Sequence, residues 1–237
     1  MASANCEPQV HVIAGPEGTG RSTAAGEFAR ATGAPVVVAD RTQCYLDIAV
    51  TSARPQGDAV TRYFLAARQV RDGEFPAEVA TSALLHQIEV LAGENPLVLV
   101  EVSSVSLTRG LAECRASLPF RFTSQVLTID DPAAHVLHLR ARALRMLTAG
   151  MLDEFALAWR AIGQRPFVSS ISGLDALVRW CEEASVNPED LASLPRDANL
   201  LMDIADWVAQ AHLERGIAQE AAFSSLSDEQ HAVNHTD

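Results

Sequence analysis

Residues 15–23 read Gly-Pro-Glu-Gly-Thr-Gly-Arg-Ser-Thr, and their types and spacing are typical of a segment that binds phosphate. The usual pattern of a phosphate-binding loop is Gly, four residues, Gly, Lys, and then Ser or Thr. Gly15 and Gly20 have this spacing, Ser22 supplies the hydroxyl, and Arg21 replaces the lysine. Glycines allow backbone amides to converge on an anion, and a helix that starts near Ser22 adds the positive end of its dipole. The segment therefore predicts a phosphate site rather than a turn that binds nothing.

The charge of the chain limits what it can bind. Its 237 residues carry a net charge of −12, which would repel a large nucleic acid. One short basic cluster contains Arg140, Arg142 and Arg145 together with His135 and His138. This cluster is too small for a duplex and suits a diphosphate or a nucleotide, so no nucleic-acid partner is expected.

Several features predict a cytoplasmic protein. No apolar stretch approaches the ~20 residues that span a bilayer, so no membrane association is expected. The first eight residues lack the basic flank and apolar core of a secretory signal. The four cysteines are scattered without disulfide or metal spacing, which favours reduced thiols. The expected assembly is a monomer.

Apolar runs at residues 10–14, 36–39, 97–100 and 126–129 predict strands. Helical patterns separate them at residues 22–32, 58–71, 77–92 and 107–117, with Gly33 as a C-cap of the first helix. Strands that alternate with helices indicate an α/β fold with a parallel sheet and flanking helices, as in P-loop NTPases. Polar residues follow three of these strands, namely the loop after Ala14, Asp40–Gln43 and Glu101–Ser104. They should converge at the carboxyl edge of the sheet.

The chain beyond residue 130 is predicted to be mostly helical. Asp131 and Pro132 have the types of an N-cap and a first helical residue, and this helix should run towards Gly150. Further helical patterns cover residues 151–162, 174–185 and 199–222. We therefore expect an α/β core over 1–130, a small C-terminal helical subdomain over 131–223, and a disordered tail over 224–237.

Several short motifs, taken in order, resemble those of isopentenyltransferases. After the phosphate loop come Asp40-Arg-Thr-Gln43, Ser52-Ala-Arg-Pro55, Arg140-Ala-Arg142, Arg165-Pro166 and Ile217-Ala-Gln-Glu220. The chain is most similar to the bacterial adenylate isopentenyltransferases that make cytokinins, and more distantly to the tRNA dimethylallyltransferases. The resemblance covers residues 10–223. It implies transfer of a dimethylallyl group from dimethylallyl diphosphate to the N6 amine of AMP, ADP or ATP, with release of diphosphate and with Mg²⁺ as cofactor.

The resemblance also implies roles for individual residues. Asp40 would be the general base, while Arg21 and Arg142 would stabilise the leaving group. Ser22 would bind Mg²⁺. The diphosphate would be held by Gly15, Gly18, Thr19, Gly20, Arg21, Ser22, Thr23 and Arg142. The acceptor would contact Glu17, Asp40, Ser52, Arg54 and Ser104, with the helical subdomain completing the channel for both substrates.

Each of these residues also has a plainer interpretation. Asp40 could cap the turn that follows it, and Arg54 and Arg142 could be surface charges. Glu101 could order metal-bound water or simply end its strand. We expect His135 and His138 to be helix-face residues rather than ligands.

The sequence departs from the family pattern in ways that affect the substrates. Glu17 lies where the family has a threonine that hydrogen-bonds the acceptor amine. A second carboxylate near Asp40 should either raise the pKa of one carboxyl or require a cationic acceptor. Residues 172–175 differ from the usual Asp-Gly-Tyr-Arg, and His212 and Arg215 align loosely with a Tyr and a His that help hold the donor. These departures favour plain dimethylallyl diphosphate over a hydroxylated donor.

Three alternatives to the adenylate enzyme stay open from the sequence. The first keeps the chemistry but prenylates a non-adenine amine or guanidine, as Glu17 suggests. The second is a small-molecule P-loop kinase, against which stand the missing lysine and the lack of an arginine-rich lid. The third is a catalytically silent nucleotide-binding protein, which the altered loop would permit.

Overall fold

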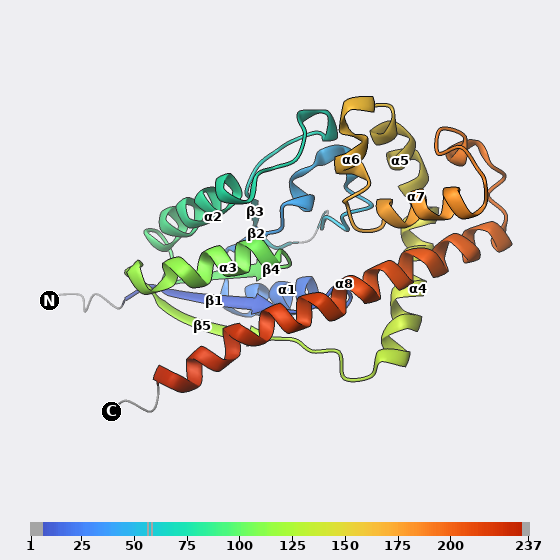
Figure 1. The fold of residues 1–237 in the computed structure, drawn as a ribbon. Helices are drawn as coiled ribbons and strands as arrows, with labels where there is room; N and C mark the ends of the chain where they lie inside the picture. Colours follow the sequence, from blue (N-terminus) through green and yellow to red (C-terminus); the bar gives the residue numbers. More distant parts are fainter. Residues whose placement is uncertain (1–6, 56, 58, 234–237) are drawn as a thin grey trace, which may run out of the picture.

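A five-stranded parallel sheet forms the centre of this computed structural model, which describes residues 7–55, 57 and 59–233 (Figure 1). The order of the strands across the sheet is β3-β2-β4-β1-β5. In chain order the strands are β1 (Gln9–Ala14), β2 (Val36–Ala39), β3 (Arg62–Phe64), β4 (Leu97–Val102) and β5 (Arg121–Val126). The parallel sheet with its flanking helices confirms the predicted α/β fold.

Eight α-helices accompany the sheet within the described residues. They are α1 (Arg21–Thr32), α2 (Ala77–Ala92), α3 (Val105–Cys114), α4 (Pro132–Thr148), α5 (Met151–Trp159), α6 (Arg165–Val168), α7 (Leu174–Glu183) and α8 (Ala198–Val233). None of the helices in this part of the chain combines the length and apolar character needed to cross a membrane.

Helices cover both faces of the sheet, which explains why its central strands are mostly apolar. All four residues of β2 are buried, and their side chains alternate between two clusters. Val36 and Val38 pack with α1 on one face. Val37 and Ala39 belong to the larger core on the other face, which α2 and α3 cover.

The helical part and the sheet are joined by α8. This helix packs against α4 and α7 in the helical part and then continues diagonally past the sheet, in front of it in Figure 1, to contact α3 and β5. The N-terminus of α4 is capped as predicted, since the Asp131 carboxylate accepts hydrogen bonds from the N–H groups of Ala133 and Ala134. Gly33 ends α1 in the left-handed region at φ 74°, with its N–H donating to Ala29, which confirms the predicted C-cap.

Three predicted segments were wrong. Residues 58–71 contain strand β3 rather than a helix, because the run Arg62-Tyr-Phe64 pairs with β2. The last strand is Arg121–Val126 rather than 126–129. It lies at the edge of the sheet, where polar side chains can reach solvent, so its apolar signal is weak. The expected tail is helical as far as Val233, since residues 224–233 contain neither Gly nor Pro, and residues 234–237 lie outside the described residues.

The carboxyl ends of β1, β2 and β4 lie at one level of the sheet. Ala14 and Ala39 both pair with Val102, so the segments that follow these three residues emerge side by side. Beneath them lies a buried ion pair between Arg62 on β3 and Glu101 on β4, at 2.9 Å. Their side chains are 5% and 3% exposed, so neither charge is compensated by solvent.

We expect replacement of Arg62 by Met to lower the free energy of unfolding by about 3–5 kcal/mol, because it leaves the Glu101 carboxylate buried without its counter-charge. Urea unfolding at neutral pH measures this difference. The matched control is Arg30→Met on the exposed face of α1, which should change the stability by less than ~0.5 kcal/mol. Equal stability of the two variants would contradict the role given to this ion pair.

Candidate active site

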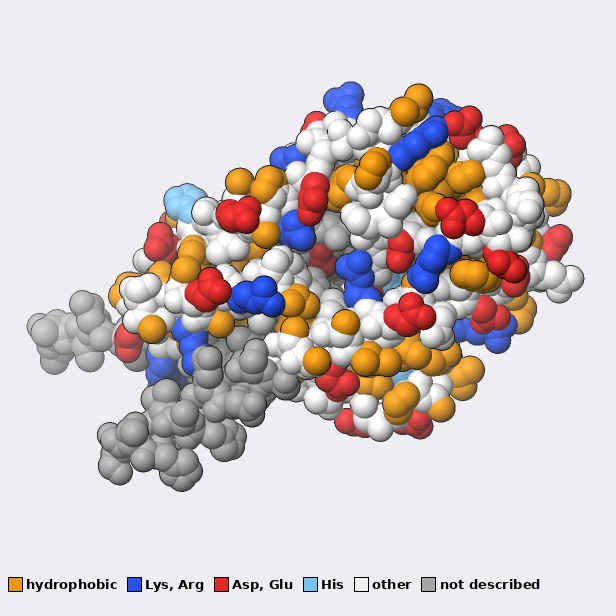
Figure 2. Space-filling model, in the orientation of Figure 1, with side chains coloured by type: hydrophobic (Ala, Val, Ile, Leu, Met, Phe, Trp, Pro, Cys, Tyr) orange, Lys and Arg blue, Asp and Glu red, His pale blue; other side chains and the backbone are white. Residues whose placement is uncertain are grey.

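Two adjoining cavities open at the carboxyl edge of the sheet. The first, here called the loop cavity, has a volume of about 250 Å³ and lies between the phosphate loop and α4. The second, the α3 cavity, has a volume of about 430 Å³ and lies beside the first turn of α3. Three residues line both cavities, namely Glu17, Asp40 and Thr42. In Figure 2, arginine and acidic side chains surround the hollow between the sheet and the helical part.

The phosphate loop has the backbone that its glycines predict. Gly18 and Gly20 have φ values of 82° and 87°, in the left-handed region that favours glycine. A Cβ atom on Gly18 would also lie 2.6 Å from the end of the Leu139 side chain of α4, which would have to shift. Gly20, Arg21, Ser22 and Thr23 line the loop cavity along the start of α1. Gly15 and Thr19 shape the loop without lining the cavity, and the Thr19 hydroxyl donates to the Pro16 carbonyl at 2.8 Å.

Ser22 is oriented by the buried ion pair beneath it. Its hydroxyl donates to one carboxylate oxygen of Glu101, whose other oxygen accepts from Arg62. The oxygen of Ser22 therefore keeps its lone pairs for the loop cavity, which it lines. Mg²⁺ is commonly held by one or two protein oxygens together with waters and phosphate oxygens, and Ser22 fits this role. Within the described part of the chain, no cluster of three or more His, Cys, Asp or Glu side chains could hold a metal alone.

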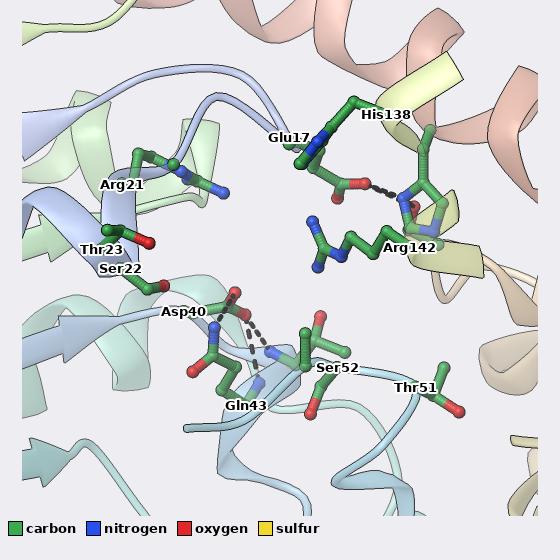
Figure 3. A pocket seen from close by; sticks show the side chains of 16 residues that line it. Glu17, Arg21, Ser22, Thr23, Asp40, Gln43, Thr51, Ser52, His138 and Arg142 are labelled. Atoms are coloured by element: carbon green, nitrogen blue, oxygen red, sulfur yellow. Dashed lines mark hydrogen bonds and ion pairs between the residues drawn. The ribbon is translucent and has the colours of Figure 1, made fainter. Parts of the chain in front are cut away.

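Two arginines bring positive charge to the loop cavity. One guanidinium N–H of Arg21 donates to the Val102 carbonyl at 2.7 Å, which fixes this cation at the end of β4. Burial lowers the pKa of Arg21, while the nearby Glu101 and Asp40 carboxylates act in the opposite direction. Arg142 extends from α4 into the cavity (Figure 3). It makes no hydrogen bond or ion pair with any residue that the structure describes, so its guanidinium is available to an anion.

The other members of the basic cluster divide into two groups. His135, His138 and Arg142 lie three and four residues apart, so they share the face of α4 that is turned towards the loop. His138 lines the loop cavity, and the Nε2 atom of His135 lies 2.9 Å from the Glu17 carbonyl. Both histidines therefore lie on a face of α4, as expected, and this face is turned towards the phosphate loop. Arg140 faces α8 instead, where it pairs with Asp206 at 2.6 Å.

Asp40 caps the turn that follows it and also lines both cavities. Its Oδ1 atom accepts from the backbone N–H groups of Thr42 at 2.7 Å and Gln43 at 3.2 Å, which is the turn-capping role. Its Oδ2 atom accepts from the side-chain amide of Gln43 at 3.3 Å. The same carboxylate lines both cavities, so these donors fix it at their junction (Figure 3).

The remaining predicted acceptor residues lie in different places. Ser52 lines the loop cavity, and Ser104 lines the α3 cavity, where its hydroxyl contacts that of Ser106 at 3.0 Å. Arg54 lines neither cavity. Its guanidinium lies 3.5 Å from the centre of the Phe64 ring and donates to the Gln43 carbonyl, so it supports the turn that carries Asp40.

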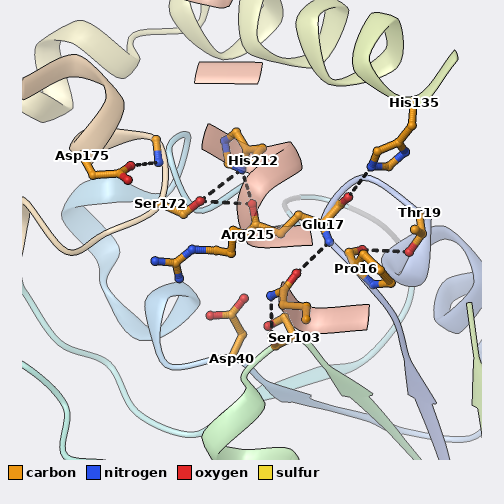
Figure 4. A network of polar contacts seen from close by, with 12 residues as sticks. Pro16, Glu17, Thr19, Asp40, Ser103, His135, Ser172, Asp175, His212 and Arg215 are labelled. Atoms are coloured by element: carbon orange, nitrogen blue, oxygen red, sulfur yellow. Dashed lines mark hydrogen bonds and ion pairs between the residues drawn. The ribbon is translucent and has the colours of Figure 1, made fainter. Parts of the chain in front are cut away.

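Glu17 is held through all of its polar groups (Figure 4). Its N–H donates to the side-chain oxygen of Gln219 at 2.9 Å, and its carbonyl contacts His135. Its carboxylate contacts the Nδ1 atom of His212 and accepts from the Ser172 hydroxyl at 3.1 Å. Gln219 also donates to the Ser103 carbonyl at 2.8 Å, so it links the phosphate loop to the segment after β4.

The charge on Glu17 is compensated within the protein. Burial alone would raise the pKa of this carboxyl, but the charge of His212 and its hydrogen bond, together with Arg142 and Arg215, lower the pKa to about 2. The sequence had suggested a raised carboxyl pKa or a cationic acceptor. That expectation was wrong for the pKa of Glu17, because its counter-charge comes from a helix 195 residues away in the chain.

Sequence reasoning missed the residues that position the site from a distance. Arg62 and Glu154 lie in segments that carry no chemical motif of their own. Gln219 lies in the Ile217–Glu220 stretch, but that motif did not indicate a contact with the phosphate loop. Glu154 of α5 accepts hydrogen bonds at 2.8 Å from the N–H groups of Val50 and Thr51, which places residues 51–53 on the wall of the loop cavity. No local pattern predicts such contacts, because they depend on how the helical part packs against the loops.

Comparisons with known sequences agree on one family. A sequence profile described as isopentenyl transferase matches residues 8–234. An adenylate dimethylallyltransferase of Rhodococcoides fascians is 33% identical over 225 residues, covering 92% of this chain and 88% of that protein. A second adenylate dimethylallyltransferase, from Agrobacterium tumefaciens (strain T37), is 28% identical over 227 residues, covering 90% of each chain.

Solved structures support the same fold at lower sequence identity. A tRNA isopentenylpyrophosphate transferase of Bacillus halodurans superimposes with a TM-score of 0.67 at 12% identity, covering 90% of this chain and 86% of that one. The corresponding enzyme of Staphylococcus epidermidis gives a TM-score of 0.66 at 11% identity, with 92% and 90% coverage. At these identities the likeness establishes the fold alone.

The Glu17 environment predicts a specific response to acid. The pKa of Glu17 is about 2 in the folded protein and 4.5 ordinarily, so its ionised form stabilises the fold fully above pH 4.5. This contribution is lost as the pH falls from 4.5 towards 2. We expect the stability advantage of the wild type over Glu17→Gln to shrink across that window, by at most about 3 kcal/mol, in urea unfolding series. The control Glu89→Gln, on the exposed face of α2, should show no such trend. A constant difference between wild type and Glu17→Gln would contradict the assignment.

Proposed function

The chain belongs to the isopentenyl transferase family, and from that premise we propose that it transfers a dimethylallyl group from dimethylallyl diphosphate to the N6 amine of AMP, ADP or ATP and releases diphosphate. The family and its adenylate relatives identify the chain as a prenyltransferase. The main observation that supports these substrates and this reaction is that two cavities meet at Asp40. One cavity is walled by the phosphate loop and Arg142, and the other is walled in part by Tyr45, Phe75 and Phe167.

The loop cavity suits the diphosphate of the donor. The backbone amides at the start of α1 and the guanidinium groups of Arg21 and Arg142 supply positive potential from two sides. As the allylic C–O bond breaks, its electron pair leaves with the diphosphate, and these groups stabilise the developing charge. When bound at Ser22, Mg²⁺ would neutralise part of the charge on the phosphate oxygens.

Asp40 suits the role of general base. The acceptor nitrogen forms a bond to the same allylic carbon and must then lose one proton. The Asp40 carboxylate lies in the wall that both cavities share, so it can reach a nitrogen at their junction. Its hydrogen bonds from Thr42 and Gln43 keep it oriented while it accepts that proton.

The α3 cavity supports an adenine acceptor over a cationic one. Its aromatic side chains offer flat apolar surface, while Ser104 and Arg109 offer polar contacts near its rim. Glu17 was the main support for an amine or guanidine acceptor. Because the Glu17 carboxylate already contacts His212, whose protonated form would balance its charge, the site does not need a cationic substrate for this purpose.

One assay separates the candidate functions. Purified protein is incubated with dimethylallyl diphosphate, Mg²⁺ and a panel of acceptors, and the products are read by mass. We expect a gain of C5H8 on adenine nucleotides. The same gain only on a non-adenine amine or guanidine would replace the acceptor, and phosphate transfer from ATP would indicate a kinase. No product with any acceptor would point to a silent nucleotide-binding protein.

Replacement of Asp40 by Asn should reduce turnover at least ~100-fold, because the amide cannot accept the proton that the amine loses. Binding of dimethylallyl diphosphate, followed by calorimetry, should change little, since Asp40 is not a phosphate ligand. Asp190→Asn, at an exposed position in the helical part, is the matched control and should retain wild-type turnover. Wild-type turnover in Asp40→Asn would refute its role as the base.

Replacement of Arg142 by Met should weaken binding of inorganic diphosphate and raise the KM for dimethylallyl diphosphate by about 10–100-fold, since it removes a charge-assisted contact to phosphate. Arg145→Met is the control, because Arg145 lies on the same helix with an exposed side chain that lines neither cavity. Equal effects of the two substitutions would show that general charge, rather than the position of Arg142, attracts the donor.

A further inference from the structure

Three polar residues of the C-terminal helix α8 contact the phosphate loop or the segment that leads into α4. His212 contacts the Glu17 carboxylate, Gln219 accepts from the Glu17 N–H, and Glu220 accepts from the Ile129 N–H at 3.0 Å. Between them, a Cβ atom on Gly216 would lie 3.5 Å from Pro16, so the helix backbone lies directly against the phosphate loop. The position of Glu17 therefore depends on α8 as much as on the loop itself.

His212 and Glu17 form a buried pair. His212 is 3% exposed, and the side chain of Glu17 is 16% exposed. A buried carboxylate is costly unless a counter-charge and hydrogen bonds compensate it. Among the described residues, His212 is the only titratable side chain in direct ion-pair or hydrogen-bond contact with this carboxylate, which also accepts from the neutral Ser172 hydroxyl. When it carries a proton on both ring nitrogens, this imidazole supplies the close counter-charge.

The place of Glu17 gives this pair a consequence for the substrates. Its carboxylate lies in the wall common to both cavities, across from Asp40 (Figure 4). With His212 protonated, the pair is neutral. Of the described acidic side chains that line both cavities, Asp40 is then the one without a directly paired cation. With His212 neutral, two carboxylates would face the site, and both proposed substrates are anions. The same protonation step therefore alters the potential that each substrate meets.

Other charged groups face the pair and act on it at longer range. They come from the elements packed around it and are Arg21 of α1, Asp40 after β2, His135, His138 and Arg142 of α4, Asp175 at the start of α7, and Arg215 of α8. Of these, His135 contacts Glu17 directly, but through the Glu17 carbonyl rather than its carboxylate. Arg21 and Arg142 are placed to serve the donor phosphates, and Asp175 accepts from the Gly173 N–H. Arg215 donates to the Ser170 carbonyl at 3.2 Å and lines the α3 cavity. None of them replaces the direct contact of His212.

We propose that His212 is a positioning residue that, in its protonated form, fixes the Glu17 carboxylate and cancels its charge where the two cavities meet, so that substrate binding weakens when His212 loses its proton. This inference rests on the proposed function for the identity of the substrates. It assigns to α8 a role in the reaction, although His212 need not touch either reacting atom.

The test compares the KM for AMP and the affinity for AMP from pH 5.5 to 9 in four proteins. For the wild type we expect the KM to rise about tenfold across this range. His212→Asn keeps an N–H donor for Glu17 but cannot carry charge, so its KM should be high and nearly independent of pH. Adding Glu17→Gln to this variant removes the uncompensated carboxylate and should restore the KM to within about threefold of the wild-type value at low pH. His86→Asn, on the exposed face of α2, should keep the wild-type profile.

Rescue by the double substitution is the decisive result, because a purely structural role of His212 would not be repaired by removing Glu17 as well. A wild-type pH profile in His212→Asn, or no rescue by Glu17→Gln, would overturn the inference. Failure of the proposed function is recognised separately, since AMP would then gain no C5H8. In that case the pH dependence of diphosphate binding, measured by calorimetry in the same four proteins, still decides whether the pair controls the potential of the site.

Discussion

The phosphate loop of this molecule carries a carboxylate, and that charge must be neutralised before the loop can hold an anion. A protonated His212 in contact with Glu17 would meet this requirement, and the contact also joins the two parts of the chain. The sheet supplies the loop, while the helical part supplies α4 and α8, which enclose the loop from the other side. The loop cavity lies between these parts. The packing of α8 therefore both encloses the cavity and brings His212 to Glu17.

The distribution of charge around the site follows its chemistry. Charges that only support the site are paired, as in Arg62 with Glu101 beneath the loop and Arg140 of α4 with Asp206 of α8. The guanidinium of Arg142 has no such partner among the residues described, and Asp40 is held by neutral donors alone. Leaving these two charges uncompensated costs stability, which is typical of groups that must act on a substrate.

Features that depend on neighbouring residues could be predicted from the sequence. Contacts between residues far apart in the chain could not. The glycines of the phosphate loop, the Gly33 cap and the Asp131 cap depend on neighbouring residues, and the structure contains all three. Strand β3 has three residues and β5 is a polar edge strand, so neither produces a clear apolar period. The sequence identified Glu17 as a departure, but it could not reveal what Glu17 faces, because that depends on how α8 packs against the loop.

The departures from the family pattern become less disruptive once their surroundings are considered. All 18 basic residues of the chain are arginines, so Arg21 reflects a composition without lysine rather than a change confined to the loop. It preserves the positive charge, and the Val102 carbonyl takes up one of its additional donors. Glu17 adds a negative charge, and His212 can return a positive one at the same place. A site for two anionic substrates can tolerate such changes when they leave its total charge unaltered. Arg21 in place of lysine meets this condition, and Glu17 meets it when the neighbouring His212 is protonated.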